Sequence, residues 1–416
     1  MTDVSSRPGD PTEAPRPQPE AQVPSAPRPK KQEQEHASEE ITEVAPGIIR
    51  MQLPIWMPGL GHVNMYGLMD DRGLAVVDPG LPGQQSWKAM KSRLASAGYG
   101  TKDVHTVIVT HSHPDHFGAA GRLRKESGGQ LIAHKAFTTW SLQRKGATLT
   151  EAEADRLEQE AIDEAAHYHG PSLDELPTLD EDDHAALDEI TTETQRMSVP
   201  WGGTTPWGGS KHPQPPMSRR FMIRAMRLLF APPDPTRRVR HGSPIRLAGR
   251  DWLALHTPGH TLDHLCLYDP EHGVLLSGDH VLPTITPSIG FVLPPPPNPL
   301  GDFIASLTKV LTLPDLRLLP AHGPIAASSH DRANALLAHH EHRLALCVSA
   351  LGGQARTAAE VAGQLPWTRR ERSYASLDGY NQGLAALETK AHLELLVARG
   401  VVTVTAGPPS SYRRLP

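Results

Sequence analysis

A seven-residue run from Thr110 to His116 holds four side chains that can bind a metal: His111, His113, Asp115 and His116. Apolar residues 107–109 directly precede this run, and such a short apolar stretch predicts a buried strand. α/β folds place their chemistry beyond the carboxyl ends of strands. Burying an unpaired carboxylate or imidazolium is costly, so four such groups on one turn predict a metal site rather than a solvated, histidine-rich turn.

Four more acids or histidines stand where other predicted strands end beside glycine or proline: Asp78, His260, Asp279 and His322. Glycine and proline let the chain turn sharply, so these side chains can converge from separate strands into one site. Asp78 lies in an Asp-Pro-Gly turn, where it is either a turn former or a carboxylate that orients a ligating histidine.

The elements that must position these residues follow from the apolar pattern. Strands are expected at 47–53, 62–68, 73–77, 104–109 and 129–133, with helices at 84–97 and 119–127. The first strands suggest an antiparallel opening of the sheet. After a long gap, strands are expected at 245–247, 252–255, 265–268, 274–277 and 316–319. A helix is predicted at 302–312, with Asp302 as its N-cap.

The composition describes a chain that can fold and that has no general attraction to nucleic acid or membranes. Its 416 residues suffice for two or more domains, and the net charge is −5 with histidine neutral. The two cysteines, Cys266 and Cys347, exclude a disulfide framework and a thiolate zinc site, and they favour a reducing, cytoplasmic setting. The sequence has no apolar run of membrane-spanning length, and its start does not resemble a secretory signal.

Two segments interrupt the β/α rhythm. Residues 1–38 are rich in Pro, Glu, Gln and Ser, which predicts a disordered tail or a docking tail. Residues 135–243 predict a long helical insert, with sixteen acids and one arginine at 151–193 and eight arginines and one acid at 219–246. The Met-, Phe- and Arg-bearing helix at 221–230 would either pack as a lid or bind an acyl chain and an anionic group.

The last part of the chain has the pattern of a small helical module. A helix is expected at 330–351, a capping box at Thr357 opens a short helix to 365, and another helix spans 383–399. A strand at 401–405, a turn and a basic tail follow. This order predicts a winged-helix module, which would pack, dimerise or bind nucleic acid. The histidines within 339–342 are expected to be solvated.

The order His111-x-His113-x-Asp115-His116, followed by His260, Asp279 and His322, resembles the metallo-β-lactamase superfamily. The resemblance covers residues 45–330 apart from the insert, and Thr-Pro-Gly-His, Gly-Asp and His-Gly motifs agree with it. It implies an α+β fold, an αββα sandwich with metals at one edge of two sheets. The expected domains are 39–329, which contains the insert, and a winged-helix-like domain at 330–416. The latter resembles a subgroup that includes endoribonucleases and acyl-thioester hydrolases.

The same resemblance implies a role for each ligand. One metal would be held by His111, His113 and His260, a second by Asp115, His116 and His322, and Asp279 would bridge them. These ligands fit two Zn²⁺, and also iron or manganese. Two metals about 3.5 Å apart can share a hydroxide that attacks a carbonyl or phosphoryl centre. Asp115 would also orient the water or relay a proton. Three histidines match no ligand position and are expected either to support the ligands or to pack beside them: His256, His264 and His280.

Three functions remain open from the sequence. The leading one is a dinuclear hydrolase of an acyl thioester, because the 221–230 helix suits an acyl group and the acidic half of the insert opposes a polyanion. The second is an endoribonuclease-like phosphodiesterase that acts on RNA, and the third is a winged-helix DNA-binding metal sensor. The expected partner is thus a small acyl- or phosphate-bearing molecule or RNA, without a membrane, and a homodimer is left open.

Overall fold

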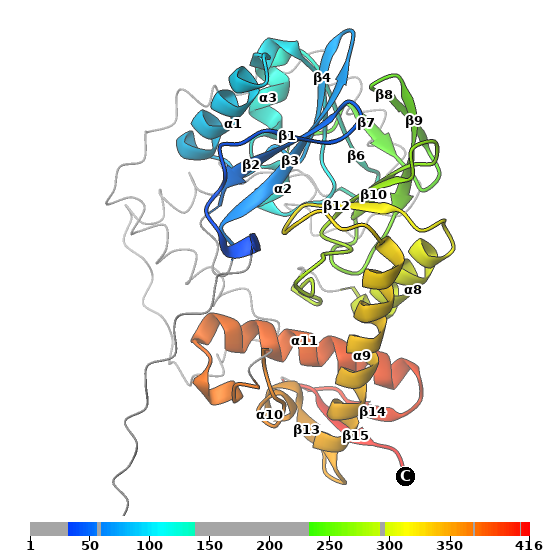
Figure 1. Ribbon diagram of the computed structural model, residues 1–416. Coiled ribbons are helices and arrows are strands. Elements are labelled where there is room, and N and C mark those ends of the chain that lie inside the picture. Colours follow the sequence, from blue (N-terminus) through cyan, green and yellow to red (C-terminus); the bar gives the residue numbers. More distant parts are fainter. Residues whose placement is uncertain (1–31, 56–59, 138–232, 292–295, 369–370, 408) are drawn as a thin grey trace, which may run out of the picture. The chain divides into compact units, whose positions relative to one another are not determined.

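A computed structural model describes residues 32–55, 60–137, 233–291, 296–368, 371–407 and 409–416. In this part of the chain, a seven-stranded sheet contains, in order, β1 (Thr42–Ala45), β2 (Ile48–Pro54), β3 (His62–Asp70), β4 (Gly73–Val77), β5 (Val104–Ile108), β6 (Gln130–His134) and β7 (Arg237–Val239). β1 to β4 pair antiparallel, as the sequence predicted. β4 to β7 pair parallel, so that the carboxyl ends of β4, β5 and β6 share one edge of the sheet (Figure 1).

A second sheet of five strands has the order β12 (Arg317–Pro320), β11 (Val274–Gly278), β10 (Leu265–Asp269), β9 (Arg250–His256) and β8 (Pro244–Leu247). β11 and β12 run parallel, and the other neighbours run antiparallel. The two sheets are joined near the site by a backbone hydrogen bond of 2.8 Å from the Leu265 N–H to the Thr110 carbonyl.

Side-chain alternation along the strands separates the layers. Leu265 and Leu267 of β10 join the core between the two sheets, whereas Cys266 and Tyr268 face the core beneath α8 (Pro299–Leu311) and α9 (Ser329–Leu351). On the other side, the first sheet packs against α1 (Gln84–Ser96) and α3 (Ala120–Ser127). This helix–sheet–sheet–helix order confirms the predicted αββα sandwich. Within the described ranges, no helix has the length and hydropathy needed to cross a membrane.

Helix α8 starts three residues earlier than the sequence predicted. Its N-cap is Asn298, whose side chain accepts a hydrogen bond from the Gly301 N–H, and Pro299 occupies the first helical position. Asp302 is therefore not the cap. The helix lies close to the loop that carries His260, because a Cβ placed on Gly259 would lie 2.4 Å from the Phe303 Cα.

We expect Gly259→Ala to lower the free energy of unfolding by about 3 kcal/mol or more, because Gly259 has a φ of +132° and no space for a Cβ. Urea unfolding measures this change. Gly249→Ala is the matched control, since Gly249 also has a positive φ of +69° but nothing within 4 Å of its Cβ position. Equal losses in the two variants would show that the contact with α8 is unimportant.

The N-terminal boundary of the fold lies earlier than predicted. Residues Gln32–Gln34 form a short 3₁₀ helix, and the Glu33 side chain within it is fully buried. The Ser38 N–H donates to the Gln52 side chain over 2.8 Å. Part of the predicted tail is thus built into the fold, because these contacts offset the cost of ordering it. Residues 1–31 lie outside the described residues.

The insert is also shorter than predicted. β7 pairs with β6 in the first sheet, and the Lys135 N–H donates to the Val239 carbonyl. The chain therefore returns to the sandwich before residue 243. Residues 138–232 lie outside the described residues, and with them the acidic half of the insert and the 221–230 helix.

The C-terminal part contains α10 (Ala358–Ala362), η4 (Tyr374–Ser376), α11 (Gly379–Ala398) and a three-stranded sheet of β13 (Arg356–Thr357), β15 (Ser411–Arg414) and β14 (Val402–Thr405). The capping box at Thr357 is present. The predicted basic tail is strand β15 instead, because it pairs with both neighbours. Among the described residues of 330–416, most of the buried apolar side chains belong to the same hydrophobic core as the second sheet rather than to a separate one. The winged-helix assignment stays a prediction.

One histidine of the 339–342 stretch is buried, contrary to the prediction. His340 is fully buried, and its Nδ1 lies 3.2 Å from Nε2 of His392 in α11. The ring also packs edge-to-face against Phe303 of α8. Burial here comes from the contact between α9 and two other helices, which a pattern along one helix does not reveal.

Candidate metal centre

The predicted ligand residues come together in two adjacent groups. One contains His111, His113, His260 and Asp279, and the other contains Asp115, His116 and His322. Within each group, the candidate ligand atoms lie within 4.8 Å of one another. The residues come from the turn after β5, the short helix α2 (Pro114–Phe117), the loop after β9, and the ends of β11 and β12. All seven predicted positions therefore meet at one edge of the sandwich.

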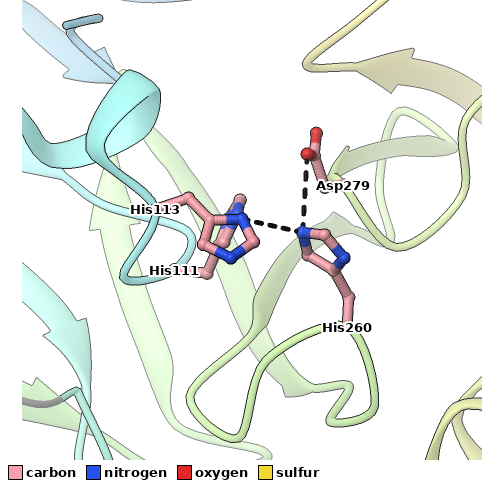
Figure 2. Close-up of side chains that lie close together, drawn as sticks. All are labelled: His111, His113, His260 and Asp279. Atoms are coloured by element: carbon pink, nitrogen blue, oxygen red, sulfur yellow. Dashed lines mark hydrogen bonds and ion pairs between the residues drawn. The ribbon is translucent and has the colours of Figure 1, made fainter. Parts of the chain in front are cut away.

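In the first group, His113 and His260 approach from opposite loops, as Figure 2 shows. Nδ1 of His113 lies 3.0 Å from Nε2 of His260, and Nε2 of His260 lies 3.6 Å from Oδ2 of Asp279. The His111 ring lies edge-on to His113, with 4.7 Å between ring centroids. These side chains converge on one point.

The Asp279 carboxylate reaches both groups. Its Oδ2 lies 3.6 Å from Nε2 of His116, the same distance as from His260, and its Oδ1 lies 3.4 Å from Nε2 of His322. Oδ2 of Asp115 lies 3.4 Å from the same His322 nitrogen. A carboxylate between two sets of imidazoles has the position that a bridging ligand requires.

The hydrogen bonds of the histidines fix which ring nitrogen faces the centre. In four of the five ligand histidines, Nδ1 donates to a protein oxygen: His111 to Thr110, His116 to Asp78, His260 to Ser288 and His322 to His62. In the neutral form of these four rings, Nε2 therefore carries a lone pair that points inward. Among the described residues, the buried Nε2 atoms of His111, His116 and His322 have no hydrogen-bond partner, nor does Oδ1 of Asp279. Such orphaned acceptors fit a cation, so the residues present suit a divalent metal.

The protonation of the two groups differs. Burial, followed by the neighbouring imidazoles, lowers the pKa of His111 well below its ordinary value, and burial lowers that of His113 to about 3. Burial opposes protonation of His116 as well, but the nearby carboxylates, Asp115 first, raise its pKa well above the usual value. The imidazoles of the first group are thus neutral and ready to bind a cation, while binding at the second group releases a proton.

Asp78 plays the orienting role that was one of its two predicted roles. It accepts hydrogen bonds from the Thr110 N–H at 2.8 Å and from the Thr110 hydroxyl at 2.7 Å. Its Oδ2 also accepts from Nδ1 of His116 at 2.8 Å. Asp78 has a φ of +55°, a strained conformation for a non-glycine residue, which the three hydrogen bonds hold in place.

The residues that hold the His322 loop were not predicted from the sequence. The Asn64 side chain donates to the carbonyls of Pro320 and Gly323, both at 2.9 Å, and the Tyr66 hydroxyl donates to the Pro320 carbonyl. Asn64 is fully buried in β3, with an apolar residue on either side of it in the sequence. An amide in such a stretch was the available signal, because a buried amide needs hydrogen-bond partners.

The three histidines expected to support the site have different surroundings. His264 is fully buried and its Nε2 accepts a hydrogen bond of 3.0 Å from the Asp279 N–H, so it positions that carboxylate. His280 is fully buried and packs against Phe303. His256 is the last residue of β9, and its ring stacks on the ring of His134 with 3.9 Å between the centroids.

We expect Asp78→Ala to weaken metal binding at the second group by about 10- to 100-fold, because His116 loses the carboxylate that orients it. Metal retained per chain during dialysis against a chelator measures this effect. Asp70→Ala, which removes a carboxylate from the outer end of β3, is the control and should retain metal as the unaltered protein does. Unchanged retention in Asp78→Ala would contradict the role given to Asp78.

The family model for the metallo-beta-lactamase superfamily matches residues 58–322, so the chain belongs to this superfamily. Two solved structures align with most of the chain at 26% identity. A metallo-beta-lactamase family protein from Thermus thermophilus has a TM-score of 0.60, covering 90% of this chain and 100% of that one. A beta-lactamase domain protein from Burkholderia ambifaria has a TM-score of 0.63, covering 91% and 96%.

Curated relatives are similar over a shorter stretch. Lactamase-like protein vrtG of Penicillium aethiopicum is 31% identical over 115 residues, 28% of this chain and 35% of that protein. Atrochrysone carboxyl ACP thioesterase of Claviceps purpurea is 31% identical over 111 residues, 27% of this chain and 33% of that protein. Acyl-coenzyme A thioesterase MBLAC2 of Gallus gallus is 31% identical over 103 residues, 24% and 35%. The chain spans about a third of the length of these relatives.

Proposed function

We propose that this chain is a dinuclear metal-dependent hydrolase and that its substrate is an acyl thioester. The observation that carries the proposal is the pair of adjacent His/Asp groups joined by Asp279, with inward-facing buried atoms that lack hydrogen-bond partners among the described residues. When bound, two divalent ions supply Lewis acidity and lower the pKa of water to near neutrality. The ligand set fits zinc, iron or manganese.

The protein residues give this chemistry its geometry. His111, His113 and His260 would hold one ion, Asp115, His116 and His322 the other, and Asp279 both. Burial opposes ionisation of Asp115, but the imidazoles of His116 and His322 hold its pKa at about 2. An ionised Asp115 can accept a hydrogen bond from the attacking water and orient it toward the acyl carbon.

The cysteines give no competing nucleophile. Cys266 and Cys347, the two cysteines of the sequence, are both buried, and burial raises the pKa of each thiol to about 12. A thiol in such a setting is inert at neutral pH. Hydrolysis by activated water is therefore favoured over a route through a cysteine acyl-enzyme.

A thioester is favoured over the other substrates by two observations. Two relatives carry the names of thioesterases, one for an acyl carrier protein and one for acyl-coenzyme A. In α11, the side chains from 381 to 397 are either buried or only partly exposed, which disfavours this helix as one that enters a DNA groove. This burial counts against the DNA-binding sensor.

Release of free thiol from acyl-CoA, measured beside cleavage of a structured RNA, tests the proposal. We expect zinc-loaded protein to cleave acyl-CoA and His113→Ala to lose this activity. Asp251→Ala is the control, because Asp251 pairs with Arg246 at an exposed site. RNA cleavage that disappears in His113→Ala, without thiol release, would instead support the phosphodiesterase.

A further inference from the structure

A hydrogen bond ties together the two loops that deliver the first metal group. The Ser112 hydroxyl donates to Oδ1 of Asp263 at 2.9 Å, across 151 positions of the sequence. Ser112 lies between His111 and His113, and Asp263 lies three residues after His260. Neither Ser112 nor Asp263 belongs to the two groups of candidate ligands.

Asp263 is an unusual residue to find in this place. Its side chain is only 2% exposed, and Oδ2 has no hydrogen-bond partner among the described residues. Thr261, two residues earlier in the same loop, is equally buried. Burying a carboxylate is costly unless hydrogen bonds offset the cost, and the bond from Ser112 is the one that crosses between the two loops. Burial raises the pKa of Asp263 to about 6, and the hydrogen bonds from Thr261 and Ser112 partly oppose this rise.

The hydrogen bond between Ser112 and Asp263 lies beside two candidate ligands, His113 and His260, and can therefore affect the distance between them. Nδ1 of His113 and Nε2 of His260 lie 3.0 Å apart, and these two residues come from the loops that the Ser112–Asp263 bond joins. The His260 side has a second attachment, the bond from Nδ1 to the Ser288 carbonyl. On the His113 side, the contact with the other loop is the hydrogen bond from the Ser112 hydroxyl to Asp263. Ser112 directly precedes His113 in the sequence.

We propose that Asp263 is a positioning residue that, through Ser112, sets the separation of His113 and His260 and thereby the metal affinity of the first group. This inference rests on the proposed metal-dependent function. It assigns no contact between Asp263 and substrate or metal. Its effect reaches the centre through the backbone on either side of Ser112.

Three substitutions separate the hydrogen bond from the charge. Ser112→Ala removes the donor, and Asp263→Ala removes the acceptor. Asp263→Asn removes the charge, but its amide oxygen can still accept from Ser112 while its NH₂ group can donate to the Thr261 hydroxyl. We expect each alanine variant to weaken zinc binding by about tenfold, and the double alanine variant to be no weaker than either single one. Asp263→Asn should stay within about twofold of the unaltered protein.

Zinc affinity is measured by competition with a chromophoric chelator, and the visible absorption of the cobalt-loaded protein reports the ligand geometry of the first group. The alanine variants should shift this spectrum, and Asp263→Asn should restore it. Asp251→Ala is the control at an exposed carboxylate. If Asp263→Ala does not fold, Ser112→Ala alone tests the positioning role, because this substitution deletes only one hydroxyl.

The results distinguish failure of the inference from failure of the proposed function. If the unaltered protein binds no metal, the proposed function fails. If it binds two ions and both alanine variants bind them equally well with unchanged cobalt spectra, the positioning role is overturned. Loss of affinity in Asp263→Asn as large as that in Asp263→Ala would also overturn it, since the charge would then be the cause.

Discussion

Asp279→Ala should remove at least one of two metals from the purified protein and reduce turnover by about 10³-fold or more. The reason is geometric, because the two Asp279 oxygens lie 3.4 to 3.6 Å from imidazole nitrogens of both groups. Loss of a residue that only supports a ligand costs about 10- to 100-fold in affinity or activity, and a shared ligand should cost more. Metal content per chain and kcat/KM measured on the same preparation test this expectation.

Two further variants identify the cause of the Asp279 effect. Asp251→Ala should keep both metals and full turnover, because it removes a carboxylate from an exposed ion pair. Asp279→Asn keeps the shape but weakens the ligand, and it should resemble Asp279→Ala in metal content. Two retained metals together with normal turnover in Asp279→Ala would contradict the assignment of the site.

Acid should destabilise the fold steeply, through histidines that lie outside the ligand groups. Burial, with a smaller effect of neighbouring charges, lowers the pKa of His134 and His340 to about 2 and that of His392 to about 4. In the unfolded chain each titrates near 6.5, so below this pH the unfolded state binds more protons. The stability that these residues contribute is complete above about pH 6.5 and is lost as the pH falls.

The expected slope is about 1.4 kcal/mol per pH unit for each buried histidine, or roughly 4 kcal/mol per unit for the three together, between about pH 6 and pH 4. Urea unfolding at a series of pH values measures it. His340→Leu should make the slope shallower by about 1.4 kcal/mol per pH unit, because one titrating histidine is lost. His342 is exposed, so His342→Gln should not change the slope. A stability that does not change between pH 7 and pH 5 would contradict the burial of these side chains.

The positions of the candidate ligands could be predicted because their signals are local. Several predicted strands end beside glycine or proline, and an acid or histidine follows, so the sheet edge brings these side chains together. Asp78 was predicted as either a turn former or an orienting carboxylate, and its bond to His116 distinguishes the two. The layers of the sandwich follow from alternation along single strands.

The missed features depend on contacts between distant segments. His340 is buried because α11 and Phe303 cover it, although its own helix has a polar pattern around it. The bond between Ser112 and Asp263 spans two loops that no periodicity relates. Asp302 was predicted to be the N-cap of α8, whereas the N-cap is Asn298, which directly precedes Pro299. Strand β7 was hidden within the long insert because its pairing partner lies about a hundred residues earlier.

Zinc titration of the metal-free protein, with thiol release from an acyl-CoA as the readout, tests whether this chain is a zinc-dependent thioesterase. We expect activity to rise with added zinc until two equivalents are bound, and His113→Ala to stay inactive throughout. A protein that binds two equivalents and releases no thiol from any acyl-CoA would contradict the thioester assignment. A protein that binds no zinc, iron or manganese would contradict the metal centre itself.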